Sequence, residues 1–156
     1  QIMMEWLELN KRIELLDNKI KSQAKSDSNA VRLMKIKGVA EKTATAVIAH
    51  AGNGAGYKNG RHFSANLGLV PKEHSSGGKQ SFGGITKRGN RYIRTLLIQG
   101  AWSVLRNATN SDDRLSKWAL KVQERRGKHK AVVAIANKVA RIMWSMLYHQ
   151  TEYKMS

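Results

Sequence analysis

The sequence predicts an all-α fold, and two observations carry that prediction. Near both ends of the chain, apolar residues recur at spacings of three and four, the period of an amphipathic helix. Ten of the thirteen glycines and the single proline, Pro71, lie between Gly52 and Gly89, so loops are concentrated in one central stretch. We therefore expect an N-terminal coiled-coil helix, a helix-hairpin-helix-like module, a glycine-rich loop and a group of C-terminal helices.

The first element is a helical arm over residues 1–28, preceding a helical domain over residues 29–156. Its apolar positions alternate spacings of four and three, typical of a coiled-coil seam: Ile2, Trp6, Leu9, Ile13, Leu16 and Ile20. The pattern is already running at Gln1, so we expect the arm to be the end of a longer helix whose beginning is missing here. Because the seam covers only about three heptads, self-association and packing on the domain's own core both stay open. Ser26, Asp27 and Ser28 offer a cap for the next helix.

The next element, Leu33 to Ala51, places the tight turn Gly38-Val39-Ala40 between an apolar approach and a second helical run. This resembles a helix-hairpin-helix motif, in which backbone N–H groups at a helix start bind a DNA phosphate without reading bases. The contacts expected here come from Lys37, Gly38, Ala40 and Lys42. Ala40 stands where the motif usually has a second glycine, and a turn that serves packing alone is the alternative.

A short helix is expected from Arg61 to Leu67, started by Asn59 or Gly60 and stopped by Gly68. A long loop is then predicted over residues 70–87, carrying His74, Ser75 and Ser76 next to two glycines. The glycines would let a phosphate approach the serine hydroxyls closely. A flexible Ser-Gly linker is the alternative, and His74 is by default a surface residue.

Basic residues follow the serines and lead into an amphipathic helix. Those expected to hold phosphate are Lys79, Lys87, Arg88, Arg91 and Arg94. Arg91 and Arg94 share one side of that helix near its start. Its buried face is predicted to comprise Ile93, Leu96, Leu97, Gly100, Ala101, Val104 and Leu105.

Two more helices complete the predicted fold, the first capped by Ser111. The turn between them, around Gly127, is strongly basic and is a second candidate nucleic-acid contact or a merely solvated turn. Its cations are Arg125, Arg126, Lys128 and Lys130. Trp102, Trp118 and Trp144 occupy apolar helical positions and are predicted to be core residues rather than base-stacking platforms.

The charge of the chain points to a polyanionic partner. Its 28 Lys and Arg against 11 Asp and Glu give a net charge of +17. Nine basic residues but one acid, Glu73, lie between residues 53 and 106, which indicates a binding face. Without cysteine there is no disulfide framework or thiolate metal site. No apolar run spans a bilayer and no signal peptide is recognisable, so a soluble, intracellular protein is expected.

Three stretches together resemble a known family: IKGVAEKTATAVIAHAGN, NGRHFSANLGLVPKEHSSGGKQSFGGITKRGNRYIRTLLIQGA and RRGKHKAVVAIANKVARIMW. They are similar to the C-terminal transposase domain of the insertion sequence one-ten family, the bridge-RNA-guided transposases, with relatives among the Piv-type DNA invertases. The resemblance covers roughly Leu33 to Leu147. It implies a prokaryotic protein that is cytoplasmic and nucleoid-associated.

The resemblance implies a serine that attacks DNA and forms a covalent phosphoserine link. The family's serine-glycine pair falls on Ser76-Gly77, with Ser75 as the alternative nucleophile. It also implies a guide (bridge) RNA, and a ribonuclease-H-like domain, not contained in these residues, whose acids bind Mg²⁺. The expected function is DNA cleavage and rejoining during transposition, by a homo-oligomer joined through the Ile2–Ile20 seam. We expect these residues alone to bind DNA or RNA but to cleave poorly. The alternative is a non-catalytic nucleic-acid-binding and oligomerisation module.

Overall fold

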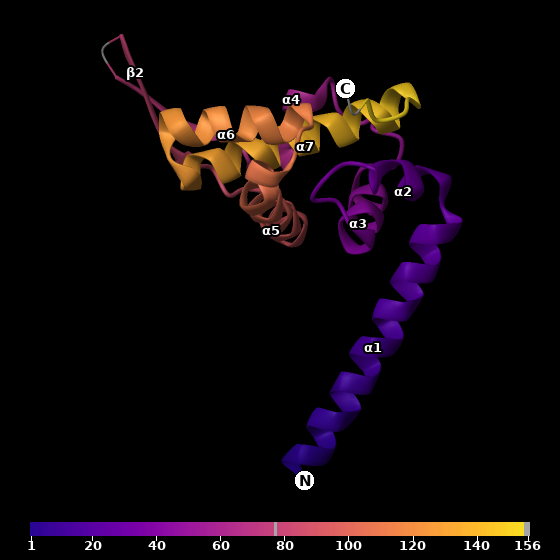
Figure 1. The fold of residues 1–156 in the computed structure, drawn as a ribbon. Helices are drawn as coiled ribbons and strands as arrows, with labels where there is room; N and C mark the ends of the chain where they lie inside the picture. The colour runs from indigo at the N-terminus through magenta and orange to yellow at the C-terminus, as the bar shows by residue number, and fades with distance from the viewer. Residues whose placement is uncertain (77, 155–156) are drawn as a thin grey trace.

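The computed structural model describes residues 1–76 and 78–154, and the side chains of residues 73–76 and 79–83 lie outside that description. The described chain is mostly helical, as the sequence predicts. In order it forms α1, α2, α3, α4, a hairpin of β1 and β2, α5, a single 3₁₀ turn, α6 and α7. Figure 1 shows a compact helical body with two projections, the arm α1 on one side and the β-hairpin on another.

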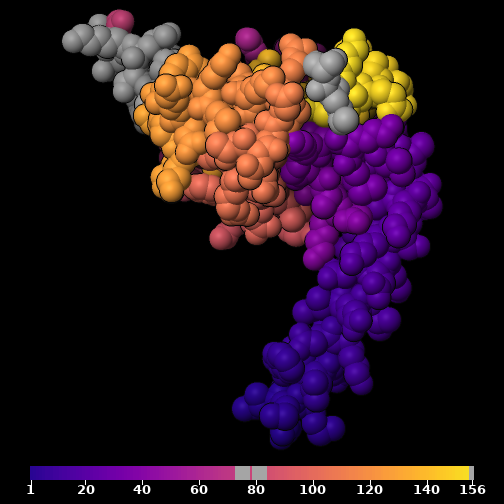
Figure 2. All heavy atoms as spheres, in the orientation of Figure 1, coloured from indigo at the N-terminus to yellow at the C-terminus, as the bar shows by residue number. Residues whose placement is uncertain are grey.

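The arm α1, Ile2–Ser26, stands clear of the body over most of its length (Figures 1 and 2). The predicted seam is therefore exposed in the isolated chain, with Ile2 at 84%, Trp6 at 62% and Leu16 at 57% of their full accessibility. Only the C-terminal end of α1 is anchored, where Ala24 is buried and Asp17 forms an ion pair with Lys42.

Helix α2, Ser28–Leu33, begins at the cap that the sequence predicts. The Asp27 carboxylate accepts hydrogen bonds from the backbone N–H groups of Asn29 and Ala30. After a turn over residues 34–40, α3 runs from Glu41 to Ala51. Both helices are too short to be stable alone, and they are held by burial of residues such as Leu33 and Val47.

Helix α4, Gly60–Asn66, confirms the predicted short helix. Its cap is Asn59, whose side-chain oxygen accepts from the His62 N–H at 2.9 Å. Phe63 anchors the helix in the core with no exposed surface.

The prediction of a long loop over residues 70–87 is wrong. This stretch forms two antiparallel strands, β1 (Pro71–Ser76) and β2 (Lys79–Ile85). The Gly-Gly pair in SSGGKQ is typical of loops and also of tight hairpin turns. The ladder pairs the backbones on both sides of that turn and shifts register between Pro71 and Glu73.

The C-terminal helices form the core. Helix α5 (Arg91–Asn107) is followed by a 3₁₀ turn (Ala108–Asn110), then α6 (Arg114–Arg126) and α7 (Lys128–His149). Helix α7 packs against α4, α5 and α6, and ten of its residues are buried. The predicted α5 face is buried except at Leu96 and Gly100, which are half-buried. Of the three tryptophans predicted in the core, Trp144 is buried, whereas Trp102 and Trp118 are half-buried.

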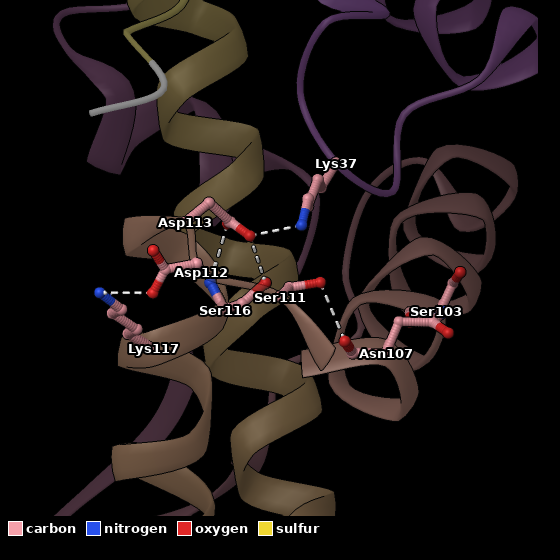
Figure 3. A network of polar contacts seen from close by, with 8 residues as sticks. All are labelled: Lys37, Ser103, Asn107, Ser111, Asp112, Asp113, Ser116 and Lys117. Carbon is pink, nitrogen blue, oxygen red and sulfur yellow. Dashed lines mark hydrogen bonds and ion pairs between the residues drawn. The ribbon is translucent and has the colours of Figure 1, made fainter. Parts of the chain in front are cut away.

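The predicted Ser111 cap of α6 is also wrong. Asp113 is the cap, because its carboxylate lies at the helix start and accepts from the Ser116 N–H at 3.0 Å. The Ser111 hydroxyl instead donates to the Asn107 carbonyl at the end of α5 (Figure 3). Across the part of the chain with described coordinates, no helix is long and apolar enough to cross a membrane.

Candidate nucleic-acid interface

The two candidate nucleophiles lie on the β-hairpin. Ser76 is the last residue of β1 and pairs with Lys79, the first residue of β2, while Ser75 pairs with Gln80. The antiparallel pairing thus brings a serine and a lysine of the predicted site to opposite positions on the two strands. The side chains of Ser75, Ser76 and Lys79 lie outside the described residues.

The base of the hairpin is closed by backbone contacts. The Lys87 N–H donates to the Gly68 carbonyl at 3.1 Å, and the Thr86 N–H donates to the Val70 carbonyl at 2.9 Å. At Gly89, whose φ is +83°, an added Cβ would lie 1.7 Å from the Asn66 carbonyl oxygen. Only glycine allows this approach, so the chain entering and leaving the hairpin is tied directly to the end of α4.

Arg94 is the side chain that joins the two ends of this base. Its Nη1 donates to the carbonyl oxygens of Leu67 and Arg88, each at 3.1 Å. These two residues flank the hairpin, so one guanidinium fixes the segments before β1 and after β2. The sequence predicts that Arg94 holds phosphate, and this stays a prediction; in the structure its Nη1 is bonded to these two backbone carbonyls.

Three further cations of the predicted phosphate group surround the hairpin base and start of α5: Lys87, Arg88 and Arg91 are all exposed. No described acidic side chain lies within ion-pair distance of them. Their charge is therefore available to an anionic ligand.

The α2–α3 turn, by contrast, has its cations paired within the chain. Lys37 forms an ion pair with Asp113, the cap of α6 (Figure 3), and Lys42 pairs with Asp17 of α1 at 2.9 Å. The hydrogen bond and charge of Asp17 raise the pKa of Lys42. A depression of about 500 Å³ lies beside this turn and is lined by Gly38, Ala40 and Lys42, among others.

The cations predicted as a second nucleic-acid contact lie on the α6–α7 turn. Arg125, Arg126, Lys128 and Lys130 are all exposed around Gly127. In Figure 1 this turn lies at the same end of the molecule as the hairpin, whereas α1 projects elsewhere. The hairpin and the α6–α7 turn thus form a basic end of the molecule.

Comparisons with known proteins show the family of the chain. Residues 30–116, from α2 through the hairpin into α6, match the model of the Transposase IS116/IS110/IS902 family. The chain belongs to this family. It is 42% identical over 146 residues to a probable family 20 transposase of Pseudomonas aeruginosa, covering 94% of the chain and 43% of that protein. It is 41% identical over 150 residues to the transposase for insertion sequence element IS1111A of Coxiella burnetii, covering 96% of the chain and 41% of that protein.

A third relative of this family member is the transposase for insertion sequence element IS1328 of Yersinia enterocolitica. The two are 35% identical over 136 residues, which cover 87% of the chain and 41% of the relative. The chain thus spans about two fifths of the length of these curated relatives. The resemblance found in the sequence motifs is confirmed at the level of the family.

Sequence reasoning missed one basic group of this transposase-family chain. Arg61 on α4 lines a depression together with Lys138 and Arg141 of α7. The basic turn predicted from the sequence ends at Lys130 and does not include Lys138 or Arg141. The signal present in the sequence was the i, i+3 spacing of Lys138 and Arg141, which places both cations on one side of a helix.

A metal site of the kind the resemblance implies does not fit the described residues. Among the side chains that the structure describes, no group of three His, Asp or Glu lies close enough to hold an ion. Several carboxylates are already occupied, Asp113 by Lys37 and Asp17 by Lys42.

Proposed function

We propose that this chain is the strand-cleaving and strand-rejoining part of a DNA transposase, with Ser76 on the hairpin as its nucleophile. The observation that carries the proposal is the β-hairpin, fixed at its base by Arg94 and followed by the exposed cations Lys87, Arg88 and Arg91, within the segment that matches the transposase family. A projecting hairpin on a rigid base suits insertion of a hydroxyl against a DNA backbone. Ser75 is the alternative nucleophile.

In the proposed reaction the Ser76 Oγ attacks the scissile phosphorus. A new Oγ–P bond forms, the bond from phosphorus to the leaving deoxyribose oxygen breaks, and that oxygen takes up a proton while the serine loses its own. The product is a phosphoserine ester that conserves the energy of the phosphodiester. Attack by another strand's deoxyribose hydroxyl reverses the chemistry and frees the serine.

The exposed cations Lys87, Arg88 and Arg91 are proposed to neutralise the phosphate as charge grows on its oxygens in the transition state. Removing one such stabilising contact in enzymes costs about 10²- to 10³-fold in rate. Arg94 acts differently, because its Nη1 is bonded to the backbone. Its proposed role is to hold the hairpin in register with these cations.

The family resemblance implies Mg²⁺ bound by acidic residues of a ribonuclease-H-like domain, with a guide RNA choosing the DNA site. When bound, Mg²⁺ stabilises charge on phosphate oxygens. The described residues offer no such ligand set. Both Mg²⁺ and the guide RNA are part of the proposal for the complete transposase.

Self-association through α1 completes the proposed assembly. The seam residues Ile2, Trp6, Leu9, Ile13 and Leu16 are each more than half exposed. Burying such a stripe against a second copy removes apolar surface from water, which stabilises the oligomer by about 25 cal/mol per Å² of apolar surface buried. An oligomer would bring two or more hairpins to one DNA substrate, as cleavage and exchange of two strands requires.

The decisive test is covalent trapping in the complete transposase. Ser76→Ala and Ser75→Ala are compared on a radiolabelled DNA substrate carrying a nick, which prevents religation. The proposal expects a protein–DNA adduct stable to SDS in the parent and in Ser75→Ala, absent in Ser76→Ala, and mapped to Ser76 by mass spectrometry. Loss of the adduct in Ser75→Ala alone would show that Ser75 is the nucleophile.

The competing function is a non-catalytic nucleic-acid-binding and oligomerisation module. Two observations favour it: the α1 seam is exposed, and so are the cations Lys87, Arg88 and Arg91. Both features can serve association and binding without any catalytic step. Recombination and adduct formation that survive in a Ser75→Ala/Ser76→Ala double variant would establish this module and exclude a serine nucleophile.

A further inference from the structure

A second basic site lies on the α4–α7 face, formed by side chains outside the hairpin site. It is a depression of about 530 Å³ that is open to solvent. Three cations line it, Arg61 from α4 and Lys138 and Arg141 from α7, along with the polar Asn59 and Ser145. Among its lining residues, all of which the structure describes, there is no acid.

The close packing of α4 on α7 brings these cations together. A Cβ on Gly60 would lie 3.2 Å from the Arg141 carbonyl oxygen, so the start of α4 rests directly on the α7 backbone at Arg141. Arg61 follows Gly60 and therefore enters the depression beside Arg141. Lys138 lies one turn earlier on α7, on the same side as Arg141.

The cations that line the depression repel one another. Burial lowers the pKa of Lys138, and the positive charges of Arg141 and Arg114 lower it further. The Lys138 Nζ also lies 4.2 Å from the centroid of the Trp118 ring, a cation–π contact that holds the ammonium in place. None of the ion pairs between described side chains involves Arg61, Lys138 or Arg141.

Concentrated like charge that costs stability in the free chain is typical of a site whose counter-charge comes with a ligand. The cations come from two elements along an open face, an arrangement suited to successive phosphates of a backbone. An isolated phosphate group would need an enclosed cradle of donors.

We propose that Arg61, Lys138 and Arg141 hold the phosphodiester backbone of duplex DNA, as a contact separate from the hairpin. The choice of DNA as the anion rests on the proposed transposase function. The contact itself carries no chemistry: it would position a duplex against the helical body, without reading sequence.

The first experiment measures binding of a short duplex by fluorescence anisotropy across a salt series. The Arg61→Gln/Arg141→Gln double variant is compared with Arg106→Gln/Lys121→Gln, which removes the same charge from exposed positions on α5 and α6. Loss of two phosphate contacts lowers the slope of log K against log salt by about 1.8. We expect that change, with a ten- to hundredfold loss of affinity, only in the first pair. Equal losses in both pairs would overturn the proposal.

The second experiment does not depend on removing charge. Because the chain contains no cysteine, Ser145→Cys introduces a single thiol at the edge of the depression. We expect duplex DNA to slow its alkylation by a maleimide several-fold, and to leave the exposed control Ser26→Cys unaffected. Unchanged alkylation, or protection by single-stranded RNA but not by duplex DNA, would overturn the proposal.

The same protection is measured in a Ser76→Ala background. If duplex DNA still protects the thiol in that background and the covalent adduct is lost, both proposals are supported. If duplex DNA still protects the thiol but the adduct also forms in the Ser75→Ala/Ser76→Ala double variant, the duplex contact is supported and the serine chemistry is rejected. Loss of protection in the Ser76→Ala background would overturn the claim that this contact is separate from the hairpin.

Discussion

Gly38 and Gly100 face each other with no side chain between them. A Cβ on Gly100 would lie 2.1 Å from the Gly38 carbonyl oxygen, and a Cβ on Gly38 would lie 2.8 Å from the Gly100 carbonyl oxygen. The α2–α3 turn therefore packs backbone to backbone on α5. This contact gives Gly38 a structural role, beside any contact that the turn makes with phosphate.

Gly100→Ala is expected to destabilise the chain despite its position in a helix. Alanine favours a helix interior over glycine by about 1 kcal/mol, but the new methyl group would push the turn away from α5. Overpacking of this kind costs about 1–3 kcal/mol, so we expect a net loss in the free energy of unfolding, measured with urea. Gly56→Ala is the control, because no atom lies within 4 Å of a Cβ there. A stabilised Gly100→Ala variant would contradict the close contact.

The Asp113 carboxylate is expected to make the free energy of unfolding depend on pH in the acid range. Burial favours its neutral form, but hydrogen bonds from Lys37 and Ser116, together with the charge of Lys37, outweigh this and lower its pKa from 3.8 to about 2. Because the folded pKa is the lower one, the stabilisation is complete above about pH 4 and is lost as the pH falls toward 2. Its size is about 2 kcal/mol.

The measurement is the unfolding free energy of Asp113→Asn against the parent between pH 6 and pH 2. Asparagine keeps a helix cap but loses the ion pair, so we expect a gap of about 2 kcal/mol at pH 6 that closes below pH 4. Asp112→Asn is the matched control, because the neighbouring Asp112 side chain is 99% exposed (Figure 3). A gap that stays constant down to pH 2 would refute the lowered pKa.

Arg94→Met should loosen the hairpin without unfolding the body. The hydrogen bonds from Arg94 to Leu67 and Arg88 would be lost, and each is worth about 1 kcal/mol. We expect amide hydrogen exchange at Thr86 and Lys87 to accelerate about tenfold. Arg91→Met, on the same helix but exposed, should leave exchange unchanged and weaken DNA binding. The reverse pattern would make Arg94 the phosphate ligand that we first expected.

The α1 seam should control oligomeric state. Leu9→Glu and Ile13→Glu place charges on the stripe and are expected to convert an oligomer to monomer, measured by light scattering during size-exclusion chromatography. Leu15 is equally exposed, at 62%, but lies off the seam, so Leu15→Glu is the matched control. The same mass for all three variants and the parent would exclude the seam as an interface.

Local signals predicted most of the elements correctly. The caps Asp27 and Asn59 and the short helix before Gly68 were readable because each depends on residues within one turn. The hairpin was missed because its glycines and serines suit both loops and tight turns, and only pairing of the two strands decides between them. Ser111 was preferred to Asp113 because both residue types cap helices; the ion pair with Lys37 exists only in the folded chain.

The sequence by itself determined the helical class, the basic character and, through its motifs, the transposase family. These depend on periodicity, composition and residue order, which folding does not change. The tertiary structure decided which cations are available to a ligand. Lys37, Lys42 and Arg94 are engaged within the chain, while Arg61, Lys138 and Arg141 come together in an unexpected place. The reason is physical: whether a charge is paired depends on distances between residues far apart in sequence, and packing alone sets those distances.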